Sequence, residues 1–256
     1  MRTLAIAVLA VGVLGCGNPS SPRPGAASPE PALGGSLTVF AAASLAEALT
    51  DDKTQLLSVN RDLRLSFSFA GSQQVVAQVQ AGAPADVAAT ADEASMQRLV
   101  SGNLVETPTT IARNLLEVVV APGNPRKVRG LADLGRADLR VVLEDPAVPA
   151  GRYARQALDR KGLTVTPVSL ELDVKSALQK VEGGEADAAI VYVTDVRSAG
   201  RRVTGVAIPA DQNVVATYQA AVVRATAHAA AARAFVAQLQ SGFGQQALRA
   251  RGFSSP

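Results

Sequence analysis

The chain has 256 residues, a formal net charge of +3 and a hydrophobic content of 48%. This length and composition are typical of a globular protein with one large domain or two lobes, and they exclude a disordered chain. Aromatic residues make up only 4% and tryptophan is absent, which argues against a sugar-stacking or nucleic-acid stacking site. The small basic excess also argues against nucleic acid as a partner.

Residues 1–16 predict a lipoprotein signal peptide. A basic residue precedes the apolar run Leu4–Leu14, which is too short to span a bilayer and ends in VLGC, a sequence that resembles a bacterial lipobox. Cys16 is the only cysteine and is the expected lipidation site, although a simple cleaved signal with an incidental cysteine is the alternative. Residues 17–35 are rich in Pro, Ser, Gly and Ala and predict a tether. We therefore expect an exported protein, periplasmic or at the cell surface, that is lipid-anchored to a bacterial membrane.

After the tether, predicted strands and helices alternate, which is typical of an α/β fold with a largely parallel sheet. The expected strands are Leu37–Phe40, Leu63–Phe69, Asp86–Ala89, Leu115–Ala121, Arg140–Leu143, Val165–Val168, Ala188–Val193, Val203–Ile208 and Val214–Val223. The expected helices are one after Ser44, Gln73–Ala81, one capped by Asp92, Gly151–Lys161, Val174–Glu182, Ala227–Ser241 and Phe243–Arg251. The charged run Asp51–Lys53 interrupts the apolar stripe of the first helix.

These elements form two similar series of strand–loop–helix units, which predicts two α/β lobes. Two segments that cross between the lobes are expected near Leu115–Ala121 and Ile208–Tyr218. The predicted boundaries are residues 36–117 for the first part of lobe 1, 118–207 for lobe 2 and 208–256 for the return to lobe 1.

Four helix starts carry the functional prediction. In open α/β sheets ligands bind beyond the carboxyl ends of the strands, and a helix N-terminus offers unpaired N–H donors with about +0.5 of charge. Four such starts that converge would suit a dianion without a charged side chain. Taken singly, each serine is typical of an ordinary helix N-cap, and Asp173 has the wrong charge to contact an anion. The four starts lie at Ser44, Ser72, Ala150 and Val174.

Several motifs, in this order between Leu37 and Phe253, resemble the molybdate-binding substrate receptors of bacterial ABC importers. They are FAAASL, FAGSQQ followed by AGAPADV, EDPAVPAGRYARQAL, DVKSAL and IVYVTD. The resemblance implies a two-lobed, type II-like periplasmic binding protein in which each lobe is a mostly parallel sheet flanked by helices, and which closes by a hinge around an oxyanion. It also implies a monomeric, non-enzymatic receptor without a cofactor, which binds molybdate, and with it tungstate, and delivers it to a membrane permease.

The resemblance also assigns the ligand residues. It implies hydroxyl and backbone donors from Ser44 and Ser72, backbone N–H donors from Ala150 and Val174, and the phenol O–H of Tyr192. The metal is then held as an oxyanion, with no side chain coordinating it directly. Without the resemblance, Tyr192 in a buried strand is a more ordinary core residue. This sequence departs from the family's pattern in its Asp51–Lys53 run and in Gln219, where many relatives have proline.

Other functions remain open at this point. Within the same class of receptor, the alternative is a protein that binds another oxyanion, such as sulfate or phosphate. An exported hydrolase is disfavoured because the only histidine, His228, lies in an alanine-rich run where a solvent-facing helix residue is expected, and no HxxxH or Gly-rich phosphate loop with lysine is present. The effector domain of a transcription regulator is disfavoured by the export signal and by the lack of a leading helix-turn-helix.

Overall fold

Nine strands pair into one mixed sheet within residues 33–256, the part of the chain that the structure, a computed structural model, describes. Their order is β2-β1-β3-β9-β4-β7-β5-β6, and β8 also pairs with β4. The predicted signal peptide, Cys16 and most of the predicted tether lie outside the described residues. The strands are β1 Gly35–Ala42, β2 Leu63–Ala70, β3 Val87–Thr90, β4 Thr109–Val120, β5 Val141–Glu144, β6 Ser169–Glu171, β7 Ala188–Tyr192, β8 Thr204–Ala207 and β9 Val215–Val222.

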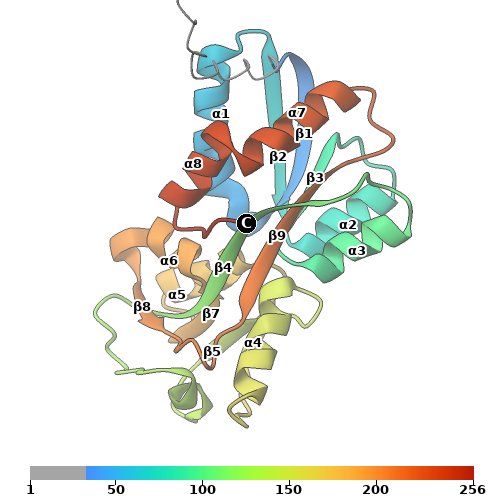
Figure 1. Ribbon diagram of the computed structural model, residues 1–256. Helices are drawn as coiled ribbons and strands as arrows, with labels where there is room; N and C mark the ends of the chain where they lie inside the picture. Colours follow the sequence, from blue (N-terminus) through green and yellow to red (C-terminus); the bar gives the residue numbers. More distant parts are fainter. Residues whose placement is uncertain (1–32) are drawn as a thin grey trace, which may run out of the picture. The chain divides into compact units, whose positions relative to one another are not determined.

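Eight α-helices and three short 3-10 helices flank this sheet within the same residues (Figure 1). The α-helices are α1 Ala46–Val59, α2 Ser72–Gln80, α3 Glu93–Ser101, α4 Pro149–Asp159, α5 Val174–Glu182, α6 Val193–Ala199, α7 Ala229–Gln240 and α8 Gly242–Ala250. The 3-10 helices are Ala43–Leu45, Leu131–Gly135 and Gly200–Arg202. None of the helices described is long and apolar enough to cross a membrane.

The sheet is parallel within each half and antiparallel where the halves join. β1 runs parallel to β2 and β3, and β5 runs parallel to β6 and β7. The long strand β4 is antiparallel to β9 over Thr109–Leu115 and antiparallel to β7 over Leu116–Val120. We call the half with β1, β2, β3 and β9 lobe 1, and the half with β5, β6, β7 and β8 lobe 2. The chain therefore passes from lobe 1 to lobe 2 inside β4.

The return crossing lies in the loop between β8 and β9, and it is tied to the first crossing. The Asn213 side chain accepts a hydrogen bond from the Leu116 N–H at 3.0 Å and donates to the Leu116 carbonyl at 2.8 Å. An amide side chain thus replaces a strand partner at the point where β4 leaves β9. The lobe boundaries themselves, at 117/118 and 207/208, stay predictions.

Helices cover both faces of the lobe 1 strands (Figure 1). Side chains of α1, α7 and α8 pack with Leu37 and Val39 of β1 in the main core, whereas α2 and α3 pack with Phe40 of β1 in a second, smaller core. Alternate residues of one strand thus face different helix layers, as the two-residue period of a strand requires. This layered packing fixes the positions of the strand ends that carry the site.

Two details of the sequence prediction are wrong. The strand expected at Val165–Val168 lies instead at Ser169–Glu171, because Ser169 is the residue that pairs with Val142 of β5. The short helix α6, which begins directly after the buried strand β7, was not expected. The charged run Asp51–Lys53 lies inside α1, where Asp52 takes a buried position on the helix and accepts a hydrogen bond from Gln238 Nε2 at 2.7 Å.

Candidate functional site

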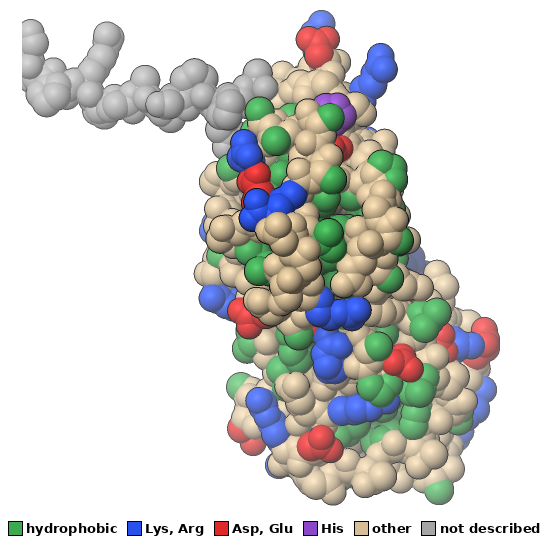
Figure 2. Space-filling view, turned by 90° about the vertical axis from the view of Figure 1, so that its right-hand side faces the viewer, with side chains coloured by type: hydrophobic (Ala, Val, Ile, Leu, Met, Phe, Trp, Pro, Cys, Tyr) green, Lys and Arg blue, Asp and Glu red, His purple; other side chains and the backbone are tan. Residues whose placement is uncertain are grey.

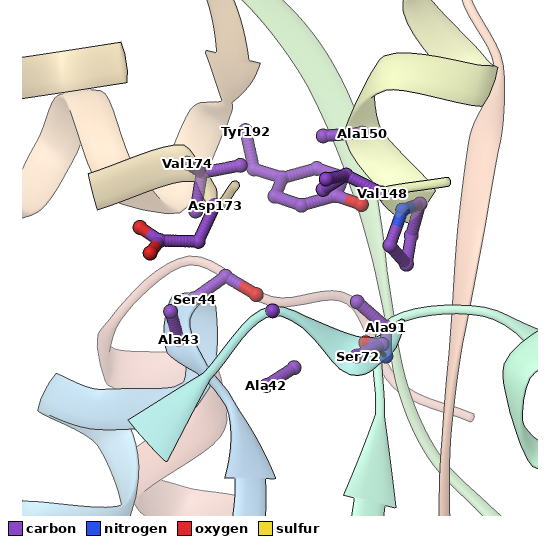
Figure 3. Close-up of a pocket in the computed structure, with 12 residues that line it drawn as sticks. Ala42, Ala43, Ser44, Ser72, Ala91, Val148, Ala150, Asp173, Val174 and Tyr192 are labelled. Carbon is purple, nitrogen blue, oxygen red and sulfur yellow. Dashed lines mark hydrogen bonds between the residues drawn. The ribbon is translucent and has the colours of Figure 1, made fainter. Parts of the chain in front are cut away.

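A cavity of about 20 Å³ lies between the ends of the strands of the two lobes (Figure 3). All five residues predicted to bind the ligand line it, and no lysine, arginine or histidine is among the lining residues. The small space suits a single compact ligand. The lining residues are Ala42, Ala43, Ser44, Gly71, Ser72, Ala91, Val148, Pro149, Ala150, Asp173, Val174 and Tyr192.

Ser44 comes from the turn between β1 and α1. The strand ends in small buried residues, and a 3-10 turn, Ala43–Leu45, leads into the helix. The Ser44 hydroxyl does not cap α1 and lies 2.8 Å from the Tyr218 hydroxyl, a buried contact in which either oxygen can donate. When Tyr218 donates, the Ser44 proton is left to point into the cavity.

Ser72 occupies the equivalent position after β2. It is the first residue of α2, is 1% exposed, and accepts a hydrogen bond from the Ala91 N–H at 3.0 Å. Because the Ser72 oxygen is the acceptor in that bond, its own proton remains available to a ligand. The N-cap of α2 is Gly71, so neither serine is the ordinary helix cap that each of them suggests singly.

Lobe 2 supplies two helix starts. Helix α4 begins at Pro149, so the Ala150 N–H lies in its first turn, where no intrahelical acceptor exists. At the start of α5, the Asp173 carboxylate accepts hydrogen bonds from the N–H groups of Lys175 and Ser176 at 2.8 and 3.0 Å. Asp173 is therefore a helix cap, as expected, and it leaves the Val174 N–H free to donate to a ligand.

The start of α4 sits unusually close to the end of β5, and a glycine makes this possible. A Cβ at Gly151 would lie 2.2 Å from the Asp145 carbonyl oxygen and 2.5 Å from that of Glu144. Because no side chain fits there, Gly151 allows α4 to point its first N–H groups into the cavity from close range.

Tyr192 closes the cavity from the end of β7. Its ring packs edge-on against Tyr218 at 5.8 Å, and Figure 3 shows its hydroxyl and that of Ser44 directed into the space between the lobes. Burial, and secondarily the neighbouring Tyr218, raises the pKa of Tyr192 well above its ordinary value, so the group is a permanent donor. The hydroxyl is buried and has no hydrogen-bond partner within residues 33–256. A buried donor without an acceptor is expected where a ligand completes the site.

Two buried acids lie near Tyr192 in lobe 2. Glu144 is fully buried at the end of β5, and burial raises its pKa from 4.5 to about 8. Asp195 is also fully buried, and burial raises its pKa against the opposing effect of Lys175, whose Nζ lies 3.1 Å away. A neutral Glu144 presents no negative charge to an anion in the cavity.

The sequence did not reveal every part of the site. Tyr218, which positions Ser44, lies in an apolar strand with nothing in its sequence context to mark it, and the small residues Gly71 and Ala91 carry no chemical signal either. His228 is exposed, as expected, but it precedes its helix and contacts an acid. It is the N-cap residue of α7, and its ring Nδ1 lies 3.1 Å from Asp86 Oδ1, away from the cavity.

Comparison with known proteins agrees with this architecture. Residues 37–254 match the family described as bacterial extracellular solute-binding protein. The chain is 41% identical over 254 residues, 99% of this chain and 97% of the relative, to the molybdate-binding protein ModA of Mycobacterium tuberculosis. The chain belongs to the bacterial extracellular solute-binding protein family.

Solved structures show the same fold for this family member. The periplasmic molybdate-binding protein of Azotobacter vinelandii is 23% identical with a TM-score of 0.74, over 86% of this chain and 99% of that one. The sulfate-binding protein SubI of Mycobacterium tuberculosis is 22% identical with the same TM-score of 0.74, over 85% of this chain and 86% of that one. The two-lobed α/β periplasmic binding-protein fold that was predicted is therefore confirmed, but the fold alone does not choose between these ligands.

Proposed function

We propose that this solute-binding protein captures molybdate, and with it tungstate, between its two lobes and delivers the anion to an ABC importer. The observation that carries the proposal is a small cavity into which two hydroxyl-bearing turns, two helix starts and a buried phenol bring donors, without a basic side chain. The likeness to the ModA relative favours molybdate over other oxyanions. The proposed ligand residues are Ser44, Ser72, Ala150, Val174 and Tyr192.

The donors are sufficient for tight binding. Hydrogen bonds to a charged group contribute about 1.5–3 kcal/mol each, so six or seven of them give about 10–20 kcal/mol in total. Micromolar affinity needs about 8 kcal/mol, which leaves a margin for removing water from a dianion and for closing the lobes. Because the two backbone N–H groups can only donate and each hydroxyl must give up its donor role to accept, an anion that carries its own proton loses at least one hydrogen bond from this shell.

The experiment is a calorimetric titration of residues 36–256 with molybdate, tungstate, sulfate and phosphate. We expect binding of molybdate and tungstate with similar affinity, because the two anions are similar in size and charge. Weak or no binding is expected for hydrogen phosphate, which carries a proton. Binding of sulfate without binding of molybdate would overturn the ligand assignment and leave sulfate as the ligand.

We also propose that the protein is a monomer and that a lipid on Cys16 anchors it to the membrane. The support is the VLGC sequence at the end of the apolar run, followed by the Pro- and Ser-rich tether. In cells fed a labelled lipid precursor, the wild-type chain should acquire the label and Cys16→Ala should not. A labelled Cys16→Ala chain would remove the anchor proposal, and sedimentation of residues 36–256 tests the monomeric state.

A further inference from the structure

We propose that two ion pairs across the cleft, Glu47–Lys175 and Asp92–Arg152, form a clasp that holds the lobes closed and sets the rate at which the anion leaves. The inference rests on the proposed function, because it concerns release of the anion from the same cavity. Each of the four side chains lies within three residues of a cavity residue, yet none lines the cavity itself. The clasp therefore acts on closure without contacting the ligand.

The first pair joins the start of α1 to the start of α5. Lys175 Nζ lies 2.8 Å from both carboxylate oxygens of Glu47, which is on the opposite lobe and three residues beyond Ser44. The same ammonium group lies 3.1 Å from the buried Asp195 of its own lobe. Burial lowers the pKa of Lys175, but the carboxylates of Asp195 and Glu47 together outweigh burial and raise the pKa above its ordinary value. Lys175 therefore stays charged. Lys175 remains tied to Asp195 when the lobes part, and Glu47 is the partner that leaves.

The second pair joins the start of α3 to the start of α4. Arg152 donates through Nη2 to Asp92 Oδ2, and the Asp92 side chain is only 2% exposed. Asp92 is held in lobe 1 as the N-cap of α3, where Oδ1 accepts from the Ser95 N–H at 3.0 Å. Arg152 is held in lobe 2 by a 2.7 Å hydrogen bond from Nη1 to the Ala147 carbonyl. As in the first pair, a cation held in lobe 2 meets an acid of lobe 1.

The two pairs lie on opposite sides of the cavity. In Figure 3, Ser44 lies beneath Val174, the residue before Lys175, on one side, and Ala91, the residue before Asp92, lies beneath Val148 on the other. Figure 2 shows basic side chains at the level where the two lobes meet on the side of α3 and α4. Two contacts that exist only in the closed form and that flank the ligand favour closure over opening. They therefore slow release more than they affect capture.

The test compares release rates of Glu47→Gln, Arg152→Gln and the double variant with that of the wild type. Release is followed by stopped-flow tyrosine fluorescence after molybdate-loaded protein is diluted, since the chain has three tyrosines and no tryptophan. We expect each single variant to release about three- to tenfold faster, and the double variant to release faster by about the product of the two factors. High salt should accelerate release from the wild type and have much less effect on the double variant.

The matched control is Asp51→Asn. Asp51 is on α1, one turn beyond Glu47, and its ion pair with Arg251 at 2.6 Å lies entirely within lobe 1. This variant should release molybdate at the wild-type rate. Arg152→Lys should recover part of the wild-type rate, which separates the charge from the shape of the side chain.

The outcomes separate the clasp from the proposed function. Melting temperatures of wild type, Glu47→Gln and Arg152→Gln, measured without molybdate, separate a general loss of stability from loss of the clasp. Wild-type release rates in both single variants, or equal acceleration in Asp51→Asn, would overturn the clasp while leaving the receptor intact. A wild type that binds none of the four oxyanions would overturn the proposed function and the clasp with it.

Discussion

Replacing Tyr192 by phenylalanine is the sharpest test of the ligand shell. The substitution removes one oxygen atom that is buried and unpaired within residues 33–256, and it leaves the ring that packs on Tyr218 in place. An O–H that donates to a dianion contributes about 1.5–3 kcal/mol. We therefore expect the dissociation constant for molybdate to rise about 12- to 150-fold.

The same change should not destabilise the protein in the absence of the anion. A buried hydroxyl without a partner costs free energy in the folded state, so phenylalanine at position 192 should leave the free energy of unfolding unchanged or slightly raised. Calorimetric titration gives the affinity, and urea unfolding without anion gives the stability. Loss of binding without loss of stability is the signature of a hydroxyl that serves the ligand.

Tyr153→Phe provides the control, because Tyr153 is on α4 in the same lobe and does not line the cavity. It should bind molybdate as the wild type does. Unchanged affinity in Tyr192→Phe, or a loss of affinity matched by an equal loss of stability, would refute the assignment of the phenol as a ligand donor.

Two further substitutions test residues that lie behind the ligand-binding groups and support them. Because burial raises the pKa of Glu144 from 4.5 to about 8, the folded protein retains a proton that the unfolded chain releases, so the free energy of unfolding falls as pH rises between these values. Glu144→Gln should remove up to about 5 kcal/mol of that fall. Urea unfolding at about pH 5 and about pH 9 gives the fall in the free energy of unfolding, and an equal fall in the variant and the wild type would contradict the prediction. Gly151→Ala must displace the start of α4, since its Cβ would lie 2.2 Å from the Asp145 carbonyl oxygen. We expect about tenfold or greater loss of affinity and a lower melting temperature, neither of which should occur in Gly130→Ala, where a Cβ meets no atom within 4 Å.

The sequence predicted those parts of the molecule that depend on local chemistry. Asp92 and Asp173 were expected to cap helices and do so, because an acceptor before a helical pattern satisfies the first N–H groups in any tertiary context. The helix start at Val174 was found for the same reason, whereas the start at Ala150 was found from Pro149, which occupies the first position of α4. Their convergence was inferred from the rule that loops gather at the carboxyl ends of strands.

The errors lie where distant contacts decide the structure. The burial of Asp52 could not be foreseen, because its hydrogen-bond partner, Gln238, comes from α7, and nothing near Asp52 in the sequence indicates that partner. Strand β6 is displaced from its expected position because an edge strand takes its register from its single neighbour, β5. Likewise, the partner of Ser44 is Tyr218, which follows it by 174 residues.

The placement of charge explains how one cavity can both hold and release a dianion. Charged cations in the cavity would bind the anion strongly, but release would then require a buried ion pair to be broken. Here the groups that face the ligand are neutral donors. Lys175 and Arg152 lie outside the cavity and pair with acids of the opposite lobe. In the proposed clasp, closure is thus stabilised by contacts outside the cavity, whereas selection is left to hydroxyl and N–H groups. Such a shell accepts anions that are fully deprotonated, which selects molybdate, tungstate and sulfate over hydrogen phosphate and leaves the size of the cavity to separate sulfate from the other two.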